Sequence, residues 1–242
     1  MENSSYFAHD THKYMYCADG VFSDFVFSLI KTIVPDNFSQ YAQVYEMGAG
    51  MGRFSFALVK NFPRVSLIEP SESYARVLRK LFDTQQVSIV NMTMEEFFKN
   101  NTIAPNSIFF NFHLLHHLSP AQRREYFSYL CQACVPAVFL EPNPWNPLIV
   151  FQLMINPDMR MKNEWQYLTL TRKKLSREFN TAGLSVAAYG KLCQVPPPIA
   201  KRAVKVPVLK RSLLFLDYSK YFLPFLSSYH LFYTTPRQTA AS

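Results

Sequence analysis

The chain has 242 residues, enough for one domain with a sizeable core, and 49% of them are hydrophobic, which excludes general disorder. The formal net charge of +8 at pH 7 predicts a surface that attracts anions non-specifically. Four cysteines are too few and too scattered for a disulfide framework, which favours a reducing, cytoplasmic location. No signal-peptide pattern and no apolar run of the roughly 20 residues required for a membrane span is visible.

The predicted elements alternate between short apolar strands and amphipathic helices. A polar and aromatic start precedes a helix over 24–34, which Asp24 caps and Pro35 ends. Strands are predicted at 43–47, 65–69, 87–91, 107–112, 137–141, 184–189 and 229–234. Helices between them are predicted at 52–62, 71–82, 94–99, 119–134 and 171–182, with capping residues Ser71, Thr93, Ser119 and Thr171. Cys131 and Cys134 are expected to be buried structural residues at the end of one of these helices.

This alternation predicts an α/β fold, in which helices cover both faces of a parallel sheet. Ligands of such sheets bind beyond the carboxyl ends of the strands. Five segments fall at such ends and should line one cleft, namely 47–52, 69–71, 91–94, 111–117 and 141–145. Two long segments, 142–169 and 194–228, interrupt the alternation.

A glycine-rich turn after the first strand points to a nucleoside cofactor. Gly48, Gly50 and Gly52 follow Glu46 at every second position, and glycine permits backbone to approach a ligand closely. Glu69 ends the next strand, where an acid can accept hydrogen bonds from ribose hydroxyls.

The spacing distinguishes between two cofactors. A dinucleotide fingerprint requires glycine at i, i+2 and i+5, whereas Arg53 occupies the i+5 position. An acid two residues before the first glycine would also repel a pyrophosphate. The same acid suits the ammonium group of S-adenosylmethionine.

Four motifs together resemble class I S-adenosylmethionine-dependent methyltransferases. They are Glu-Met-Gly-Ala-Gly-Met-Gly at 46–52, Glu-Pro-Ser at 69–71, Asn-Phe-His-Leu-Leu-His-His-Leu at 111–118 and Glu-Pro-Asn-Pro-Trp-Asn-Pro-Leu at 141–148. The resemblance implies a Rossmann-like fold in a single domain, 1–242, whose seven-stranded sheet is mostly parallel with an antiparallel last strand. Its expected parts are an N-terminal helical lid 1–41, a cofactor-binding core 42–192, a basic and apolar cap 193–228, and the last strand 229–235.

The same resemblance implies roles for individual residues. Glu46 and the three glycines would hold the methionine part of S-adenosylmethionine, and Glu69 and Pro70 would hold the ribose. Thr93 and Met94 would flank the adenine, although related methyltransferases often carry an acid where Thr93 stands. Asn111 is the remaining predicted cofactor contact, and no metal site is predicted.

The residues after the fourth strand are expected to carry the chemistry. Methyl transfer needs an aligned nucleophile and a base, and histidine is the usual base. His117 and His113 are therefore the predicted catalytic residues, and the alternative is that His116 and His117 cap or pack the helix that begins at Ser119. Tyr16, Asn143 and Trp145 are the predicted acceptor contacts.

The segment 194–228 mixes basic residues with apolar and aromatic ones. It is expected either to cap the substrate pocket or to contact an anionic membrane. Its basic residues are Lys201, Arg202, Lys205, Lys210 and Arg211.

The predicted function is methyl transfer to an oxygen or nitrogen of a small-molecule or lipid-linked acceptor. The cytoplasmic protein could then be peripheral to a membrane. The absence of an Asn-Pro-Pro-aromatic run after the fourth strand disfavours a nucleic-acid substrate. A non-catalytic cofactor-binding protein and a nicotinamide-dependent oxidoreductase remain as alternatives.

Overall fold

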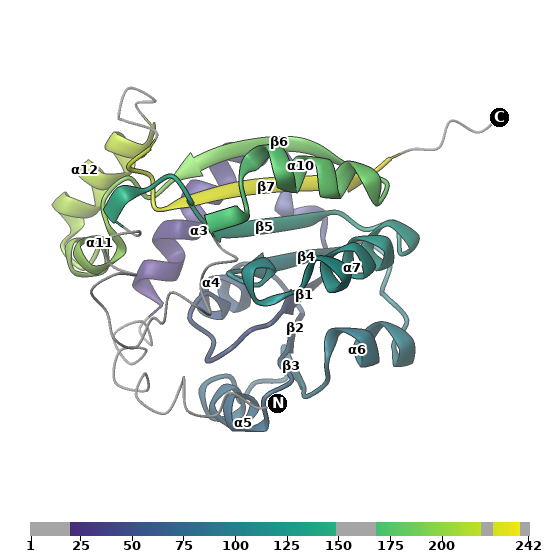
Figure 1. Cartoon of the computed structure of the whole chain (residues 1–242). Coiled ribbons are helices and arrows are strands. Elements are labelled where there is room, and N and C mark those ends of the chain that lie inside the picture. Colours follow the sequence, from purple (N-terminus) through teal and green to yellow (C-terminus); the bar gives the residue numbers. More distant parts are fainter. Residues whose placement is uncertain (1–19, 149–167, 219–224, 238–242) are drawn as a thin grey trace.

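The computed structural model describes residues 20–148, 168–218 and 225–237 (Figure 1). The strands are β1 Gln43–Met47, β2 Val65–Ile68, β3 Val87–Val90, β4 Ser107–Phe112, β5 Ala137–Pro142, β6 Leu184–Leu192 and β7 Tyr229–Pro236. The helices are α3 Val21–Ile33, α4 Ser55–Asn61, α5 Glu72–Leu81, α6 Met94–Asn100, α7 Pro120–Gln132, α10 Arg172–Thr181, α11 Pro197–Ala203 and α12 Pro207–Tyr218. Two short 3-10 turns are η1 Phe38–Gln40 and η2 Leu115–His117.

The seven strands form one sheet in the order β3-β2-β1-β4-β5-β7-β6. β1 to β5 pair in parallel, whereas β7 runs antiparallel to both β5 and β6. The predicted α/β fold, with a mostly parallel sheet and an antiparallel last strand, is therefore confirmed. The carboxyl ends of β1, β2, β4 and β5 meet at one edge of the sheet.

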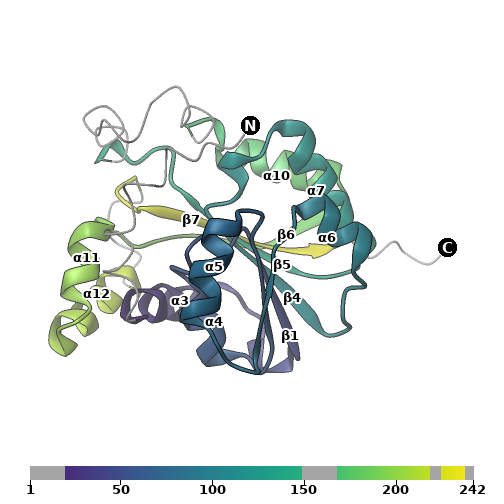
Figure 2. The same ribbon diagram turned by 90° about the horizontal axis from the view of Figure 1, so that it is seen from below.

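Helices cover both faces of this sheet (Figures 1 and 2). α3, α4 and α5 pack into one hydrophobic cluster, and α6, α7 and α10 pack into another. Strand alternation explains how β4 serves both clusters, since Phe110 and Phe112 join the first and Phe109 joins the second. A strand buried on both faces reads as a continuous apolar run in the sequence.

Two helices begin at positions other than the predicted ones. α3 begins at Val21 rather than Asp24, and the φ of 69° at the preceding Gly20 lies outside the helical region. α4 begins at Ser55 rather than Gly52, because the φ of 80° at Gly52 lies outside the helical region.

The helix caps follow the sequence more closely. Thr93 and Ser119 each form a complete capping box, and the Thr171 side chain accepts the Lys174 N–H. Ser71 precedes α5 as predicted but makes no side-chain cap hydrogen bond. The prediction for Cys134 is wrong, because this residue is exposed beyond the end of α7.

The insertion between β6 and β7 forms α11 and α12 beside the carboxyl end of β5. Leu192 and Pro142 both pair with Tyr229, so the insertion leaves and re-enters the sheet where β5 ends. Both helices pack against α3 and stand together at one end of the molecule (Figures 1 and 2). Among the described residues, no helix is long and apolar enough to cross a membrane.

A buried arginine fixes the loop that follows β4. Arg123 on α7 donates from Nε and Nη2 to the two carboxylate oxygens of Glu178 on α10, at 2.7 and 3.0 Å. Its Nη1 donates to the Leu118 carbonyl at 2.7 Å. The guanidinium thus joins two helices to the end of the loop 113–118.

Arg123→Ala should lower the free energy of unfolding by about 3 kcal/mol, because it leaves the Glu178 carboxylate and a loop carbonyl without their donor. Urea denaturation monitored by circular dichroism measures this. The neighbouring, exposed Arg124→Ala is the matched control and should change stability by less than about 0.5 kcal/mol. Equal effects of the two variants would contradict the role of Arg123.

Candidate active site

The glycine turn after β1 lies at the carboxyl edge of the sheet. A Cβ on Gly52 would lie 2.6 Å from the Phe82 ring, so packing requires glycine there. A Cβ on Gly50 would meet no atom within 4 Å among the residues that the structure describes. Gly48, Gly50 and Gly52 all have positive φ values, of 72°, 57° and 80°. The turn therefore presents backbone to a space into which a ligand can come close.

Glu69 bridges the glycine turn and the end of β2. Its Oε2 accepts the Gly50 N–H at 2.8 Å and its Oε1 accepts the Ser71 N–H at 2.9 Å. The Asn91 amide donates to the carbonyls of Glu69 and Pro70, which holds the backbone of this acid. Burial raises the pKa of Glu69, while the two backbone donors oppose that change. The carboxylate is thus positioned by backbone at the expected edge.

Glu46 lies on β1 and is buried. Its Oε2 accepts the Ser55 hydroxyl at 2.6 Å. Burial raises the pKa of Glu46 to about 8. The hydrogen bond from Ser55 opposes this rise, and the negative charge of Glu69 adds to it. A cationic ligand at this edge would stabilise the ionised carboxylate.

Two further predicted cofactor residues have other partners. The Thr93 hydroxyl is used in the capping box with Glu96 at the start of α6, where Met94 is also buried. Asn111 lies within β4, where its amide donates to the Val138 carbonyl and accepts the Tyr126 hydroxyl. Because this amide is fully buried and serves the core, we leave Asn111 out of the proposed cofactor contacts.

A histidine and a buried carboxylate form a pair at the ends of β4 and β5. His116 Nδ1 and Glu141 Oε2 lie 2.7 Å apart, and the other Glu141 oxygen accepts the Leu115 N–H at 2.7 Å. Glu141 is fully buried, as expected for a group whose hydrogen bonds are made by protein. The carboxylate engages Nδ1 and so orients the imidazole, and proton exchange by this ring would use its other nitrogen, Nε2.

The two histidines predicted to be catalytic flank this pair. The His113 ring packs between Phe54 and Tyr229, with ring centroids 5.6 and 5.0 Å away. Burial, followed by the charge of Arg53, holds the pKa of His113 well below its usual range. The His117 ring lies 4.1 Å from that of His116, but His117 is exposed to solvent. Among the three, only His116 is hydrogen-bonded to a carboxylate within the described part of the chain.

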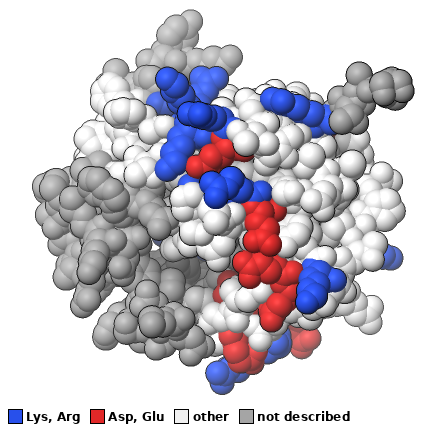
Figure 3. All heavy atoms as spheres, turned by 45° about the vertical axis from the view of Figure 1, so that its right-hand side comes forward, with Lys and Arg blue, Asp and Glu red and all other residues white. Residues whose placement is uncertain are grey.

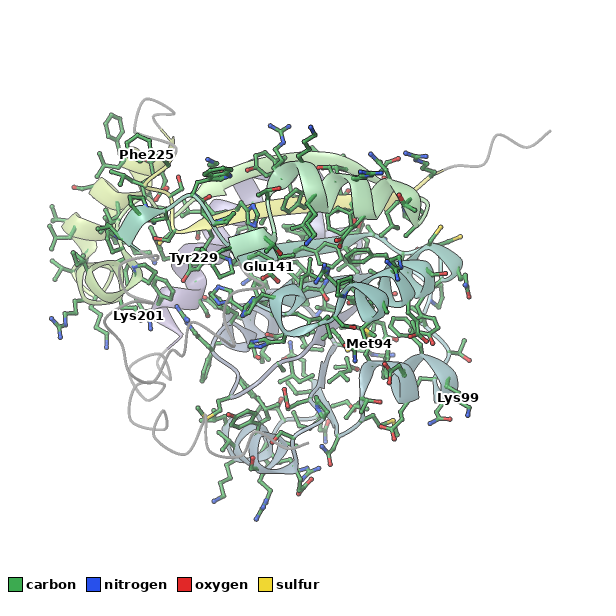
Figure 4. All side chains as sticks on the ribbon, in the orientation of Figure 1. Met94, Lys99, Glu141, Lys201, Phe225 and Tyr229 are labelled. Carbon is green, nitrogen blue, oxygen red and sulfur yellow. The ribbon has the colours of Figure 1, made fainter. Side chains whose placement is uncertain are left out.

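Cationic side chains join the insertion to the glycine turn. Arg53 donates to the Tyr229 hydroxyl at 3.0 Å, and its guanidinium lies 5.3 Å from the centre of the Phe22 ring. Lys201 on α11 lies 5.8 Å from the same ring. Figure 4 shows Glu141, Tyr229 and Lys201 in succession from β5 toward α11.

The predicted acceptor contacts are not brought together. Asn143 is fully buried and donates to the Ser227 carbonyl at 2.8 Å, so it holds the insertion in place. Trp145 is 66% exposed and points to the surface instead of the interior. Tyr16 lies outside the described residues. Among these described residues, no group of three or more His, Cys, Asp or Glu side chains is placed to hold a metal ion.

The pairing of His116 with Glu141 was not predicted from the sequence. The two residues are 25 positions apart, and only the adjacency of β4 and β5 brings them into contact. The sequence did contain a pattern that could have predicted this contact. Both residues belong to motifs at the ends of predicted parallel strands, and these motifs were expected at the same edge of the sheet.

The comparisons with known proteins bear on the fold. No family model and no curated protein matches the sequence. Among solved structures, an S-adenosylmethionine-dependent methyltransferase from Leishmania major matches with a TM-score of 0.58 at 16% identity, covering 89% of this chain and 72% of that one. The chain has the fold of class I methyltransferases.

Two other solved structures that share this fold are named for different activities. The plantazolicin methyltransferase BamL, in complex with a triazolic desmethylPZN analog and S-adenosylhomocysteine, matches with a TM-score of 0.61 at 10% identity, covering 96% of this chain and 93% of that one. The cyclopropane synthase MmaA2 from Mycobacterium tuberculosis matches with a TM-score of 0.55 at 13% identity, covering 88% and 83%.

The raised pKa of Glu46 predicts a pH-dependent penalty on folding. The Glu46 carboxyl contributes most to folding stability below its unfolded pKa near 4.5, where it is protonated in both states. This contribution is lost as pH rises toward about 8, because the buried carboxyl must then ionise. Glu46→Gln should therefore gain stability relative to the unmodified protein between pH 5 and 9, by a few kcal/mol at about 1.4 kcal/mol per pKa unit.

Urea denaturation across that pH range gives the difference between the two proteins. Glu95→Gln, at an exposed carboxylate on α6, is the control and should follow the unmodified protein. A pH-independent difference for Glu46→Gln would refute the shifted pKa.

Proposed function

We propose that this protein transfers a methyl group from S-adenosylmethionine to an oxygen or nitrogen of a small-molecule or lipid-linked acceptor. The observation that carries the proposal is the His116–Glu141 pair at the edge that also holds the glycine turn and two acidic residues. The methyltransferase fold supports it, as do a plantazolicin methyltransferase and a mycolic acid cyclopropane synthase among the structures that share this fold.

The residues at this edge fit the cofactor. Gly50 leaves space against the backbone, and Glu69 offers acceptor lone pairs for ribose hydroxyls beside it. Glu46 would gain a counter-charge from the ammonium group of the methionine part. Thr93 and Met94, at the start of α6, remain the proposed adenine contacts.

The proposed chemistry of the chain itself is proton removal. The cofactor supplies an electrophilic methyl group when it is bound. His116 Nε2 accepts the proton of the acceptor hydroxyl or ammonium, and the Glu141 carboxylate stabilises the imidazolium that results. His113, which is half-buried beside this pair, has a pKa well below its usual range because of desolvation and the charge of Arg53, so it would remain neutral there.

The proposal includes location and partners. We propose a cytoplasmic protein that contacts an anionic membrane peripherally, with the α11–α12 insertion as the contacting part. The mixed charges on the face in Figure 3 do not form a continuous basic path for nucleic acid.

Glu69→Gln should weaken S-adenosylhomocysteine binding by about 1–3 kcal/mol, because the ribose hydroxyls lose a charged acceptor. Isothermal titration calorimetry measures the dissociation constant, with the exposed Glu72→Gln on the adjacent helix as control. An unchanged constant in Glu69→Gln would refute the ribose contact. Tight binding of a nicotinamide cofactor, with none of S-adenosylhomocysteine, would instead favour the oxidoreductase alternative.

His116→Ala should lower kcat by about 10²–10⁴-fold while leaving the S-adenosylhomocysteine dissociation constant within twofold, because it removes the base and not the cofactor contacts. The assay follows S-adenosylhomocysteine formation with an acceptor identified from a panel of phenols, carboxylates, amines and lipid-linked compounds.

His117→Ala is the matched comparison, since the two rings are adjacent but only His116 contacts Glu141. A large loss in His117→Ala with none in His116→Ala would restore the sequence-based assignment. Cofactor binding without turnover of any acceptor would favour the non-catalytic alternative.

A further inference from the structure

The insertion exposes apolar side chains in a regular pattern. Val208 and Phe215 on α12 are each 71% exposed and lie seven residues apart, hence on the same side of the helix. Arg211 lies between them on that side and is exposed as well. Exposed apolar side chains that cluster on one side of a helix often mark a binding surface. Val208 and Phe215, with Arg211 between them, form such a cluster.

The preceding helix continues the pattern. Ile199 and Arg202 are exposed three residues apart on α11, and Val206 is exposed in the link to α12. We define the α11–α12 surface by six of its exposed apolar and basic side chains, which are Ile199, Arg202, Val206, Val208, Arg211 and Phe215. The opposite sides of the helices hold Ala200, Val204 and Leu213 in the core, so the exposed set is a true outer face.

Two exposed aromatic residues lie at the edge of this surface. Trp145 and Phe225 come from segments far apart in the sequence, but the Asn146 amide donates to the Leu226 carbonyl at 2.9 Å and joins those segments. Figure 4 places Phe225 beside α12. Tryptophan and phenylalanine are side chains that settle at the boundary between lipid and water.

The charges of the insertion select the sign of the partner. Residues 197–218 contain five basic residues and one acid, Asp217, which accepts the Gln194 N–H. Elsewhere the signs are mixed, and the face in Figure 3 shows basic side chains in its upper part and a column of acidic ones below. Glu95 on α6 and Glu125 on α7, for example, are exposed acidic residues outside the insertion.

We propose that the α11–α12 surface, with Trp145 and Phe225 at its edge, docks on an anionic lipid bilayer. Interleaved cations and apolar side chains on short helices match a headgroup layer, which attracts the cations and admits the apolar groups beneath it. Because the insertion leaves the sheet where β5 ends, docking places the edge with His116 and Glu141 close to the lipid. This docking rests on the membrane contact in the proposed function and names the side chains that make it, but it does not depend on methyl transfer.

Co-sedimentation of the full chain with vesicles tests the docking. Vesicles of pure phosphatidylcholine are compared with vesicles that also contain phosphatidylglycerol, at low and at high salt. We expect binding to the anionic vesicles at low salt and a clear loss at high salt, because the attraction is screened. No binding to anionic vesicles at low salt, or equal binding to both vesicle types, would overturn the proposal.

Paired variants then locate the surface. Arg202→Gln with Arg211→Gln should lower the vesicle partition coefficient by about tenfold or more, since each basic residue near a charged bilayer contributes substantially. The matched control removes two exposed basic residues of α10, Lys173→Gln with Arg177→Gln, and should reduce binding less than about threefold.

The apolar contribution has its own pair. Val208→Ser with Phe215→Ser should also lower the partition coefficient by about tenfold, whereas Leu81→Ser, at an exposed leucine on α5, should leave it unchanged. Equal losses in the α10 and α11–α12 charge variants would mean non-specific attraction and would overturn the assignment of the surface. All these side chains are exposed, so thermal unfolding should confirm that every variant folds.

Discussion

The hydrogen bonds of the Glu141 carboxylate determine how the candidate site is arranged. One oxygen accepts the Leu115 N–H and the other meets His116 Nδ1, so this one buried group ties the end of β5 to the loop after β4. A buried carboxylate without partners would cost several kcal/mol, which makes this loop geometry a requirement of the fold. The imidazole is thereby fixed before any acceptor binds, and a pre-positioned base loses less entropy on the way to the transition state.

Acidic residues at the same edge are stabilised in three different ways. Glu141 has a histidine and a backbone donor, Glu69 has two backbone donors, and Glu46 has a single hydroxyl. Burial raises the pKa of both Glu69 and Glu46, and it raises the Glu46 pKa to about 8, where a single hydroxyl opposes the effect. A ligand that brings a positive charge to this edge would complete the electrostatics that the protein leaves incomplete.

The same local bonds connect the site to the surface of the molecule. Asn143 and Asn146 donate to backbone carbonyls at the end of the insertion, which fixes α11 and α12 beside the carboxyl end of β5. The loop predicted to touch an acceptor therefore supports the insertion, and its Trp145 lies exposed at the margin. Site and outer surface are neighbours because one loop is bonded to both.

The sequence by itself determined the elements of this protein. Strand periodicity, the glycine turn and the capping residues Thr93, Ser119 and Thr171 act over a few residues, so they can be recognised without tertiary structure. The order of motifs also predicted the sheet and its binding edge, because parallel strands must bring their carboxyl ends together.

Only the tertiary structure decided which side chains act there. Asn111 and Asn143 had the right positions along the chain, but packing buries their amides against Val138 and Ser227. Conversely, His116 gained its partner because β4 and β5 are adjacent in the sheet. Burial and pairing across strands are non-local, so composition and spacing predict where a site lies and tertiary contacts determine which residues form it.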